Sequence, residues 1–218
     1  MSRDEHAPPA VGQSDLDDLR QRLAAYRRVP LPTGFGWERG VDGDHLAGLL
    51  EHWATAYDWR RHEDRIRALP WTLTGADTDT PVRAVHQRAD RAGGVAVLLL
   101  HGWPDSILRF ERVLPLLSDV DVVVPALPGY PFAADTVRRG HSAAAAAGAI
   151  AGAMTELGYD RYVVSAGDVG CDVAEVLADL HEHGDRLRAE VHDQEAELAG
   201  LMRDAGDGAG HDQADLGA

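Results

Sequence analysis

The stretch that most constrains this chain is residues 161–177, where a short apolar run passes directly into a turn and then into a helical pattern. The apolar run at 162–165 predicts a buried strand. After it stands Asp168, with small residues on both sides: Ala166, Gly167 and Gly170. An acidic side chain on a strand-to-helix turn is one way to present a nucleophile. The neighbours must be small because a larger side chain would collide with the opposing backbone of so tight a turn.

Asp168 also has a plainer interpretation, as the N-cap of the following helix. An aspartate at that position accepts hydrogen bonds from the unpaired N–H groups of the first helical turn. The local sequence leaves both interpretations open.

The rest of the chain after residue 70 alternates strands with helices. Residues 71–75 and 81–89 predict two antiparallel strands around a turn, and the continuous apolar runs 95–100 and 121–125 predict strands buried on both faces. Helices are expected at about 106–117 and 142–157. This order predicts an α/β fold with a mostly parallel sheet flanked by helices. The strand ends that carry polar or turn residues should meet at one edge of the sheet.

The first 70 residues contain helical patterns and no strand pattern. Helices are expected from residue 14, over 44–57 and over about 61–69. We therefore divide the chain into a disordered tail at 1–13, a helical extension at 14–70, a sheet-containing core at 71–189 and a polar tail at 190–218.

Composition excludes several classes of function. The net charge of −15 disfavours a nucleic-acid partner, which would need a basic surface. No apolar run approaches the roughly 20 residues of a membrane span. The single cysteine, Cys171, fits a reducing compartment, so we expect a cytoplasmic protein. No cofactor or metal is expected, since His181 and His183 are two positions apart and point to different faces of a helix.

These motifs together resemble the epoxide hydrolases of the α/β-hydrolase superfamily, in the branch similar to the microsomal enzyme. The resemblance covers about residues 15–189. It rests on the helical extension with its tryptophans, on the His-Gly-X-Pro motif at 101–104 behind an apolar strand, and on the aspartate turn at 166–170.

The resemblance implies a two-step reaction on a small-molecule epoxide. Asp168 would attack an epoxide carbon and form an alkyl-enzyme ester, which water then hydrolyses with help from a histidine and an acid. The backbone N–H groups of Trp103 and Val169 would form the oxyanion hole. The remaining motif residues would shape the site, with His101 as a loop-shaping residue: His101, Gly102, Pro104, Gly167 and Gly170.

The sequence departs from the family pattern around the site. Ala166 and Val169 stand where the family's nucleophile turn has Gly and Trp, so an aromatic is missing from the site wall. Pro131 replaces a glycine in the family's Gly-Tyr-Gly-X-Ser loop, which removes a backbone donor and fixes φ.

The largest departure follows Asp168. The family continues with a cap domain, further strands, and the acid and histidine of the second step, and we expect all of these to be missing. The tail at 190–218 contains no isoleucine and no aromatic residue, so it cannot supply buried strands. His211 with Asp204 or Asp207 has no scaffold to hold it as a base. A reading frame lost near residue 189 in a GC-rich gene would account for this composition.

The sequence thus predicts an incomplete α/β-hydrolase that forms the ester without turnover. Two alternatives remain open. One is a non-catalytic remnant or interaction protein that self-associates through an exposed sheet edge. The other is a haloalkane dehalogenase-like hydrolase, which also uses an aspartate nucleophile.

Overall fold

The computed structural model describes residues 6–29, 34, 36–90, 96–135 and 140–182, and the side chains of 181 and 182 are not described. Contacts divide the chain into two compact units. One comprises residues 9–68, and the other comprises residues 1–8 together with 69–218. The boundary at 68 lies close to the predicted division at 70.

The first unit contains three helices, at the places where the sequence predicts them: α1 (Gln13–Ala24), α2 (Gly43–Thr55) and α3 (Trp59–Arg67). Helix α2 begins after Asp42, whose side chain accepts hydrogen bonds from Asp44 N and His45 N. Asp58 caps α3 in the same way, through Arg60 N. Each aspartate satisfies N–H groups that have no partner inside the helix. In the described residues no helix has the length and apolar character of a membrane span.

The stretch before α1 differs from the loose tail expected over 1–13. Glu63 on α3 accepts hydrogen bonds from Val11 N at 2.6 Å and from Trp59 Nε1 at 3.1 Å. Arg60 donates to the carbonyl oxygen of Val11 at 2.9 Å. These bonds fix the entry into α1, and only residues 1–5 lie outside the described part of this stretch.

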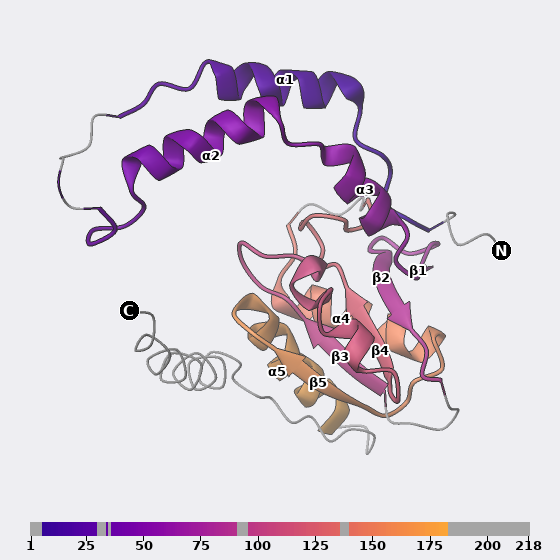
Figure 1. The fold of residues 1–218 in the computed structure, drawn as a ribbon. Helices are drawn as coiled ribbons and strands as arrows, with labels where there is room; N and C mark the ends of the chain where they lie inside the picture. The colour runs from indigo at the N-terminus through magenta and orange to yellow at the C-terminus, as the bar shows by residue number, and fades with distance from the viewer. Residues whose placement is uncertain (1–5, 30–33, 35, 91–95, 136–139, 183–218) are drawn as a thin grey trace, which may run out of the picture. The chain divides into compact units, whose positions relative to one another are not determined.

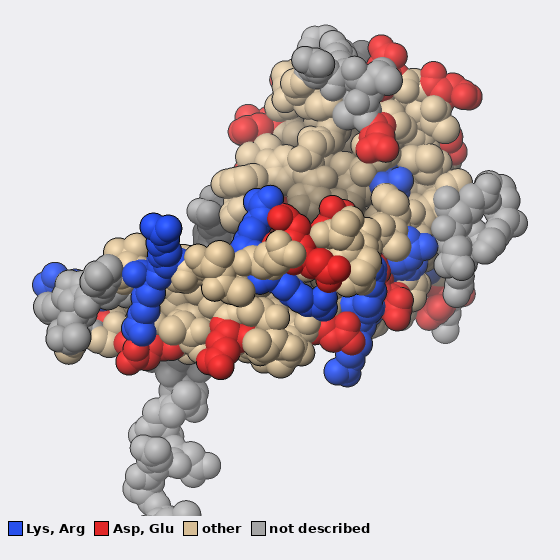
Figure 2. Space-filling view, turned by 90° about the horizontal axis from the view of Figure 1, so that it is seen from above, with Lys and Arg blue, Asp and Glu red and all other residues tan. Residues whose placement is uncertain are grey.

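Charged side chains of both signs lie interspersed on the face drawn in Figure 2. On α1, Arg20 pairs with Asp17 at 3.1 Å and Arg22 with Asp18 at 2.7 Å. All four side chains are well exposed, so each pair contributes only about 0.2–1 kcal/mol to stability.

The second unit is built on a five-stranded mixed sheet with the order β1-β2-β4-β3-β5. Its strands are β1 (Trp71–Thr74), β2 (Val82–Gln87), β3 (Ala96–Leu100), β4 (Asp121–Pro125) and β5 (Tyr162–Ala166). Strand β2 pairs antiparallel with β1 and β4, whereas β4, β3 and β5 are parallel. This confirms the predicted α/β class, with the parallel part confined to the three strands that precede the candidate site.

Helices α4 (Ala143–Glu156) and α5 (Val169–Glu182) pack against one another and onto the sheet (Figure 1). Their core is formed by alternate residues of the parallel strands together with the inner faces of both helices. Fully buried members are Leu98, Leu100, Val164, Ala147, Ile150, Met154, Val173 and Leu177. Burial of this apolar surface is the main source of stability for the three strand ends.

The helix predicted over 106–117 is wrong. The segment instead forms two short 3₁₀ turns, η1 (Ile107–Phe110) and η2 (Leu114–Leu116). Pro115 explains the difference, because it has no N–H to donate to Glu111 and its ring would clash with that carbonyl in an α-helix. Of the residues expected to face inward, Ile107, Phe110 and Leu114 are nevertheless buried, whereas Leu117 is half-buried and Val113 is exposed.

Candidate functional site

Asp168 stands at the corner between β5 and α5, as the sequence predicts. Its φ is +55°, in the left-handed region that aspartate tolerates better than most residues. The turn is closed by hydrogen bonds from Gly170 N to Gly167 O at 3.0 Å and from Cys171 N to Asp168 O at 2.8 Å. The corner lifts the Asp168 side chain away from the sheet, and it is exposed.

The corner tolerates only glycine at two positions. A Cβ on Gly102 would lie 2.5 Å from the Cβ of Asp168 and 2.8 Å from Gly167 O. A Cβ on Gly170 would lie 2.7 Å from His101 O. Close approach of the 101–104 loop to the corner therefore depends on these two glycines.

Two backbone donors converge on one oxygen of Asp168. Trp103 N donates to Oδ1 at 2.7 Å, and Val169 N donates to the same atom at 2.6 Å. Neither donor belongs to the second or third residue of α5, where a side-chain N-cap would bond. In the described part of the chain, Oδ2 accepts no hydrogen bond, and Asp168 is exposed. The geometry is therefore that of a presented carboxylate rather than of a helix cap.

The electrostatic surroundings favour the ionised form of this carboxylate. The hydrogen bond from Trp103 N–H, followed by that from Val169 N–H, lowers the pKa of Asp168 below the usual aspartate range. The guanidinium of Arg109 lowers this pKa further. Asp168 is thus an anion at neutral pH, the state that a nucleophile requires.

His101 is buried beneath the loop, with both ring nitrogens engaged. Leu127 N donates to Nε2 at 3.1 Å, so Nε2 carries no proton, and Nδ1 faces Gly102 O at 3.4 Å. Burial lowers the pKa of this imidazole, which keeps it neutral. No histidine among the described residues donates to or accepts from Asp168. These contacts fit a residue that shapes the loop rather than one that activates water.

Two side chains near the site were not singled out from the sequence. Arg109 forms an ion pair with Asp105 at 3.0 Å, and Asp105 N donates to Gly102 O. The aromatic ring of Tyr130 lies 5.1 Å from the His101 ring and 6.3 Å from the Trp103 ring. The i, i+4 spacing of Asp105 and Arg109 was visible in the sequence. The loop that contains Tyr130 was expected to meet the 101–104 loop at one edge of the sheet, but no contact of the Tyr130 ring was predicted.

The structure brings together most of the residues predicted for the site. They are Asp168, Trp103, Val169, His101, Gly102, Gly167 and Gly170, and Pro104 follows Trp103 through a cis peptide bond. The side chain of His181 and all of His183, Asp204, Asp207 and His211 lie outside the described residues. Among the residues that the structure does describe, no three His, Cys, Asp or Glu side chains gather as a metal site would require.

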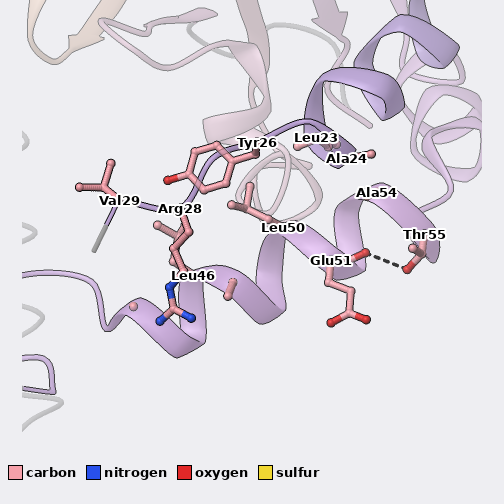
Figure 3. A pocket seen from close by; sticks show the side chains of 12 residues that line it. Leu23, Ala24, Tyr26, Arg28, Val29, Leu46, Leu50, Glu51, Ala54 and Thr55 are labelled. Atoms are coloured by element: carbon pink, nitrogen blue, oxygen red, sulfur yellow. Dashed lines mark hydrogen bonds between the residues drawn. The ribbon is translucent and has the colours of Figure 1, made fainter. Parts of the chain in front are cut away.

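The helical unit has a separate apolar groove of about 460 Å³ between the end of α1 and α2 (Figure 3). Leu23, Leu46 and Leu50 line it, and Tyr26 lies across it. A second groove of about 480 Å³ is lined by Leu49 and Trp53 on the other side of α2. The apolar stripe of this helix is therefore divided between two grooves. Both offer mainly packing surface and no activated nucleophile.

Comparison with known proteins connects this chain to one family. Residues 5–110 match the family model described as "Epoxide hydrolase N terminus". The chain is 37% identical over 186 residues to an epoxide hydrolase homologue of Stigmatella aurantiaca, covering 80% of the chain and 42% of that protein. It is 25% identical over 185 residues to epoxide hydrolase 1 of Sus scrofa, covering 78% of the chain and 40% of that protein. The chain thus spans about two fifths of the length of these relatives.

Solved structures show the same fold. The epoxide hydrolase of Aspergillus niger superposes with a TM-score of 0.71 at 24% identity, covering 85% of this chain and 51% of that one. The juvenile hormone epoxide hydrolase of Bombyx mori gives a TM-score of 0.68 at 22% identity, covering 88% of this chain and 58% of that one. Both are epoxide hydrolases, and at this level of identity the likeness shows a shared fold.

Proposed function

Because the chain belongs to the epoxide hydrolases of the α/β-hydrolase superfamily, we propose that Asp168 is the nucleophile that opens an epoxide. One observation carries the proposal: Oδ1 of the exposed Asp168 accepts both backbone hydrogen bonds, and Oδ2 accepts none from the described residues. The two oxygens of this carboxylate therefore have different tasks. Oδ2 attacks, and Oδ1 remains bound to the loop and the helix.

In the first step, Oδ2 forms a bond to an epoxide carbon and the carbon–oxygen bond of the ring breaks. The product is an ester of Asp168, with the former ring oxygen as an alkoxide that takes up a proton. The resemblance assigns that proton to tyrosines of a cap domain; in a polypeptide of these 218 residues the alkoxide takes it from solvent water. A carboxylate suits this step because it can displace at an sp³ carbon and leave an ester that water can cleave.

In the second step, water attacks the ester carbonyl of Asp168 and negative charge develops on Oδ1. The N–H groups of Trp103 and Val169 already lie 2.7 and 2.6 Å from this atom, so they need not move to stabilise the oxyanion. The water also needs a general base. His101 does not suit this task, since its Nε2 accepts from Leu127 N and the ring is buried.

We therefore expect a polypeptide of these 218 residues to form the ester and to hold it. The test is intact-mass analysis after incubation with an aryl epoxide, followed by peptide mapping. The expected result is one added epoxide mass on Asp168 and none on an Asp168→Asn variant. Catalytic release of diol would overturn the expectation that each polypeptide forms one ester and does not turn over.

The same experiment separates the alternatives. Halide release from a haloalkane, without an epoxide adduct, would assign the site to a dehalogenase. No adduct with either reagent, together with concentration-dependent sedimentation, would favour a non-catalytic protein that self-associates. A cytoplasmic location, suggested by the lone Cys171, belongs to the same proposal.

A further inference from the structure

The loop between β4 and α4 contains two successive tight turns. In the first, Tyr130 N donates to Leu127 O at 3.0 Å, with Pro128 at the second position and Gly129 at φ +86°. Proline followed by a residue of positive φ is the pattern of a type II turn. In the second turn, Ala133 N donates to Tyr130 O at 3.2 Å. Tyr130 is therefore the residue shared by both turns.

The second turn repeats the pattern with a strained residue. Pro131 takes the second position, and Phe132 has a φ of +70°, where glycine is normally favoured. A strained non-glycine residue of this kind persists only where its surroundings fix it. Pro131, the departure from the family pattern, thus occupies a corner that suits proline.

Arg83 on β2 supplies that fixation. Its Nη1 donates to Phe132 O at 3.2 Å and to Ala133 O at 2.8 Å, and its Nε donates to His6 O at 3.0 Å. The Phe132 ring also lies 6.3 Å from the Trp71 ring. The second turn is therefore anchored to the antiparallel part of the sheet, which has no other part in the site.

The first turn, in contrast, is attached to the oxyanion-hole loop. Leu127 N donates to His101 Nε2, and the Tyr130 ring meets the His101 and Trp103 rings in T-shaped contacts. Tyr130 thus touches the residues on both sides of Gly102. Aromatic pairs of this geometry attract one another beyond the effect of their buried area.

We propose that Tyr130 is a positioning residue that keeps the Trp103 N–H aimed at Asp168 Oδ1. The ring, held by the two turns and Arg83, prevents the 101–104 loop from swinging away from the β5–α5 corner. Its hydroxyl plays no part in this task. The inference rests on the proposed function for its catalytic consequence, but the position of the N–H can be measured separately.

The two steps of the reaction respond differently to this N–H. Ester formation removes negative charge from Oδ1, so it draws no electrostatic benefit from the donor. Ester cleavage creates negative charge there, so it does. Loss of one oxyanion donor typically costs about 10²–10³ in rate, and a displaced donor should cost roughly tenfold or more. Tyr130 should therefore affect cleavage much more than formation.

The experiment compares three variants of the full chain. After the aryl epoxide adduct has formed, its decay in alkaline buffer is followed by mass spectrometry. Tyr130→Leu should slow this hydroxide-driven cleavage by roughly tenfold or more, with little change in the rate of adduct formation. Tyr130→Phe should restore wild-type decay. Tyr159→Leu is the matched control, since Tyr159 is also half-buried on the same core but lies at the opposite edge of the sheet.

Amide NMR makes the test independent of the chemistry. The Trp103 amide proton, hydrogen-bonded to a carboxylate, should resonate far downfield in the wild type and in Tyr130→Phe, and should shift upfield in Tyr130→Leu. If Tyr130→Leu does not fold, Tyr130→Met replaces it. An unchanged Trp103 signal, or unchanged ester decay, in the leucine or methionine variant would overturn the inference. A wild type with no adduct but a Trp103 shift that depends on Tyr130 would instead overturn only the proposed function.

Discussion

Two aspartates at opposite ends of the parallel strands differ in how their oxygens are used, and only one of them, Asp168, is the proposed nucleophile. Asp121 begins β4 and so lies at the amino ends of the parallel strands, whereas Asp168 lies at their carboxyl ends. Its Oδ1 accepts from Ala89 N at 2.7 Å, and its Oδ2 accepts from the Tyr159 hydroxyl at 2.6 Å. The Asp121 side chain is only 18% exposed, and Arg88 lies beside it. Both oxygens are thus used and enclosed.

Asp168 has the same number of strong donors but a different distribution. Both of its donors act on Oδ1, and the side chain is exposed. Hydrogen bonds lower the pKa of both aspartates, by way of Tyr159 and Ala89 for Asp121 and by way of Trp103 and Val169 for Asp168. Ionisation alone therefore does not distinguish the proposed nucleophile. Among the described residues, an oxygen that accepts no hydrogen bond distinguishes Asp168 from Asp121.

Replacement of each carboxylate by an amide should give the largest difference between the two aspartates, in adduct formation and in stability. Asp168→Asn should abolish the epoxide adduct, since an amide is a poor nucleophile, and should leave the thermal midpoint nearly unchanged because asparagine also tolerates positive φ. Asp121→Asn should form the adduct at the wild-type rate. It should lower stability by about 1–3 kcal/mol, because a buried charged acceptor is lost. Intact mass and urea unfolding measure the two effects, and an adduct on Asp168→Asn would place the nucleophile elsewhere.

Substitution of the two packed glycines should produce the next largest effect. Gly170→Ala would bring a Cβ within 2.7 Å of His101 O and 2.9 Å of Leu100 O. Both contacts are with backbone, which cannot move aside easily, so we expect destabilisation of a few kcal/mol. Gly102→Ala should behave similarly, with loss of the adduct.

Gly148→Ala on α4 is the matched control. Nothing lies within 4 Å of a Cβ built there. An alanine should therefore stabilise the helix by about 0.5–1 kcal/mol. Unfolding curves in urea for the three variants test this ranking, and equal midpoints for Gly170→Ala and Gly148→Ala would contradict the tight corner.

Removal of the Tyr159 hydroxyl is a smaller change at the amino ends of the parallel strands, around Asp121, which we call the structural edge. The hydroxyl donates to Asp121 Oδ2 and lies 2.8 Å from His86 Nε2, with Arg88 above the Tyr159 ring at 5.6 Å. Burial and the bond to Asp121 raise the pKa of Tyr159. Tyr159→Phe should cost about 1–2 kcal/mol, since the half-buried His86 Nε2 and Asp121 Oδ2 both lose their hydrogen bond to the hydroxyl. The adduct should form at the wild-type rate, and a slower rate would show that the two edges are coupled.

The sequence predicts the surroundings of Asp168, which we call the reactive edge, better than it predicts the structural edge around Asp121. The 161–177 stretch places Asp168 correctly because strand, tight turn and helix are all local patterns. The two donors on Oδ1 come from residues 1 and 65 positions away, and only the resemblance to a family pointed to the distant one, Trp103. Tyr130 was visible only as part of a turn, because its contacts with His101 depend on the strand order.

The Asp121 cluster was not predicted because its members are distant in sequence. Tyr159 lies 38 residues from Asp121 and 73 from His86. The order β2-β4-β3-β5 is what brings them together, and no periodicity in the sequence encodes it. The helix expected over 106–117 failed for a local reason instead, since Pro115 outweighs an otherwise helical apolar pattern.

The smallest expected effect is a pH dependence that belongs to the structural edge. Burial, with a further contribution from Arg88, lowers the pKa of His86, while Asp121 opposes the shift. The unfolded chain therefore binds a proton at this histidine more readily than the folded chain, and stability should fall as the pH drops below about 6.5. Asp121, whose pKa is also lowered, adds a second loss as the pH falls through the ordinary aspartate range near 3.9.

His86→Gln separates these two contributions. Glutamine can still donate to the Tyr159 hydroxyl but does not titrate, so the decline in unfolding free energy between about pH 7 and pH 5 should become shallower. The decline below about pH 4 should remain, because Asp121 is intact. His101 also has a pKa lowered by burial, so part of the decline between about pH 7 and pH 5 should persist in this variant. If the decline between about pH 7 and pH 5 is unchanged in His86→Gln, His101 accounts for the whole of it. The pH dependence would then belong to the reactive edge and not to the structural edge.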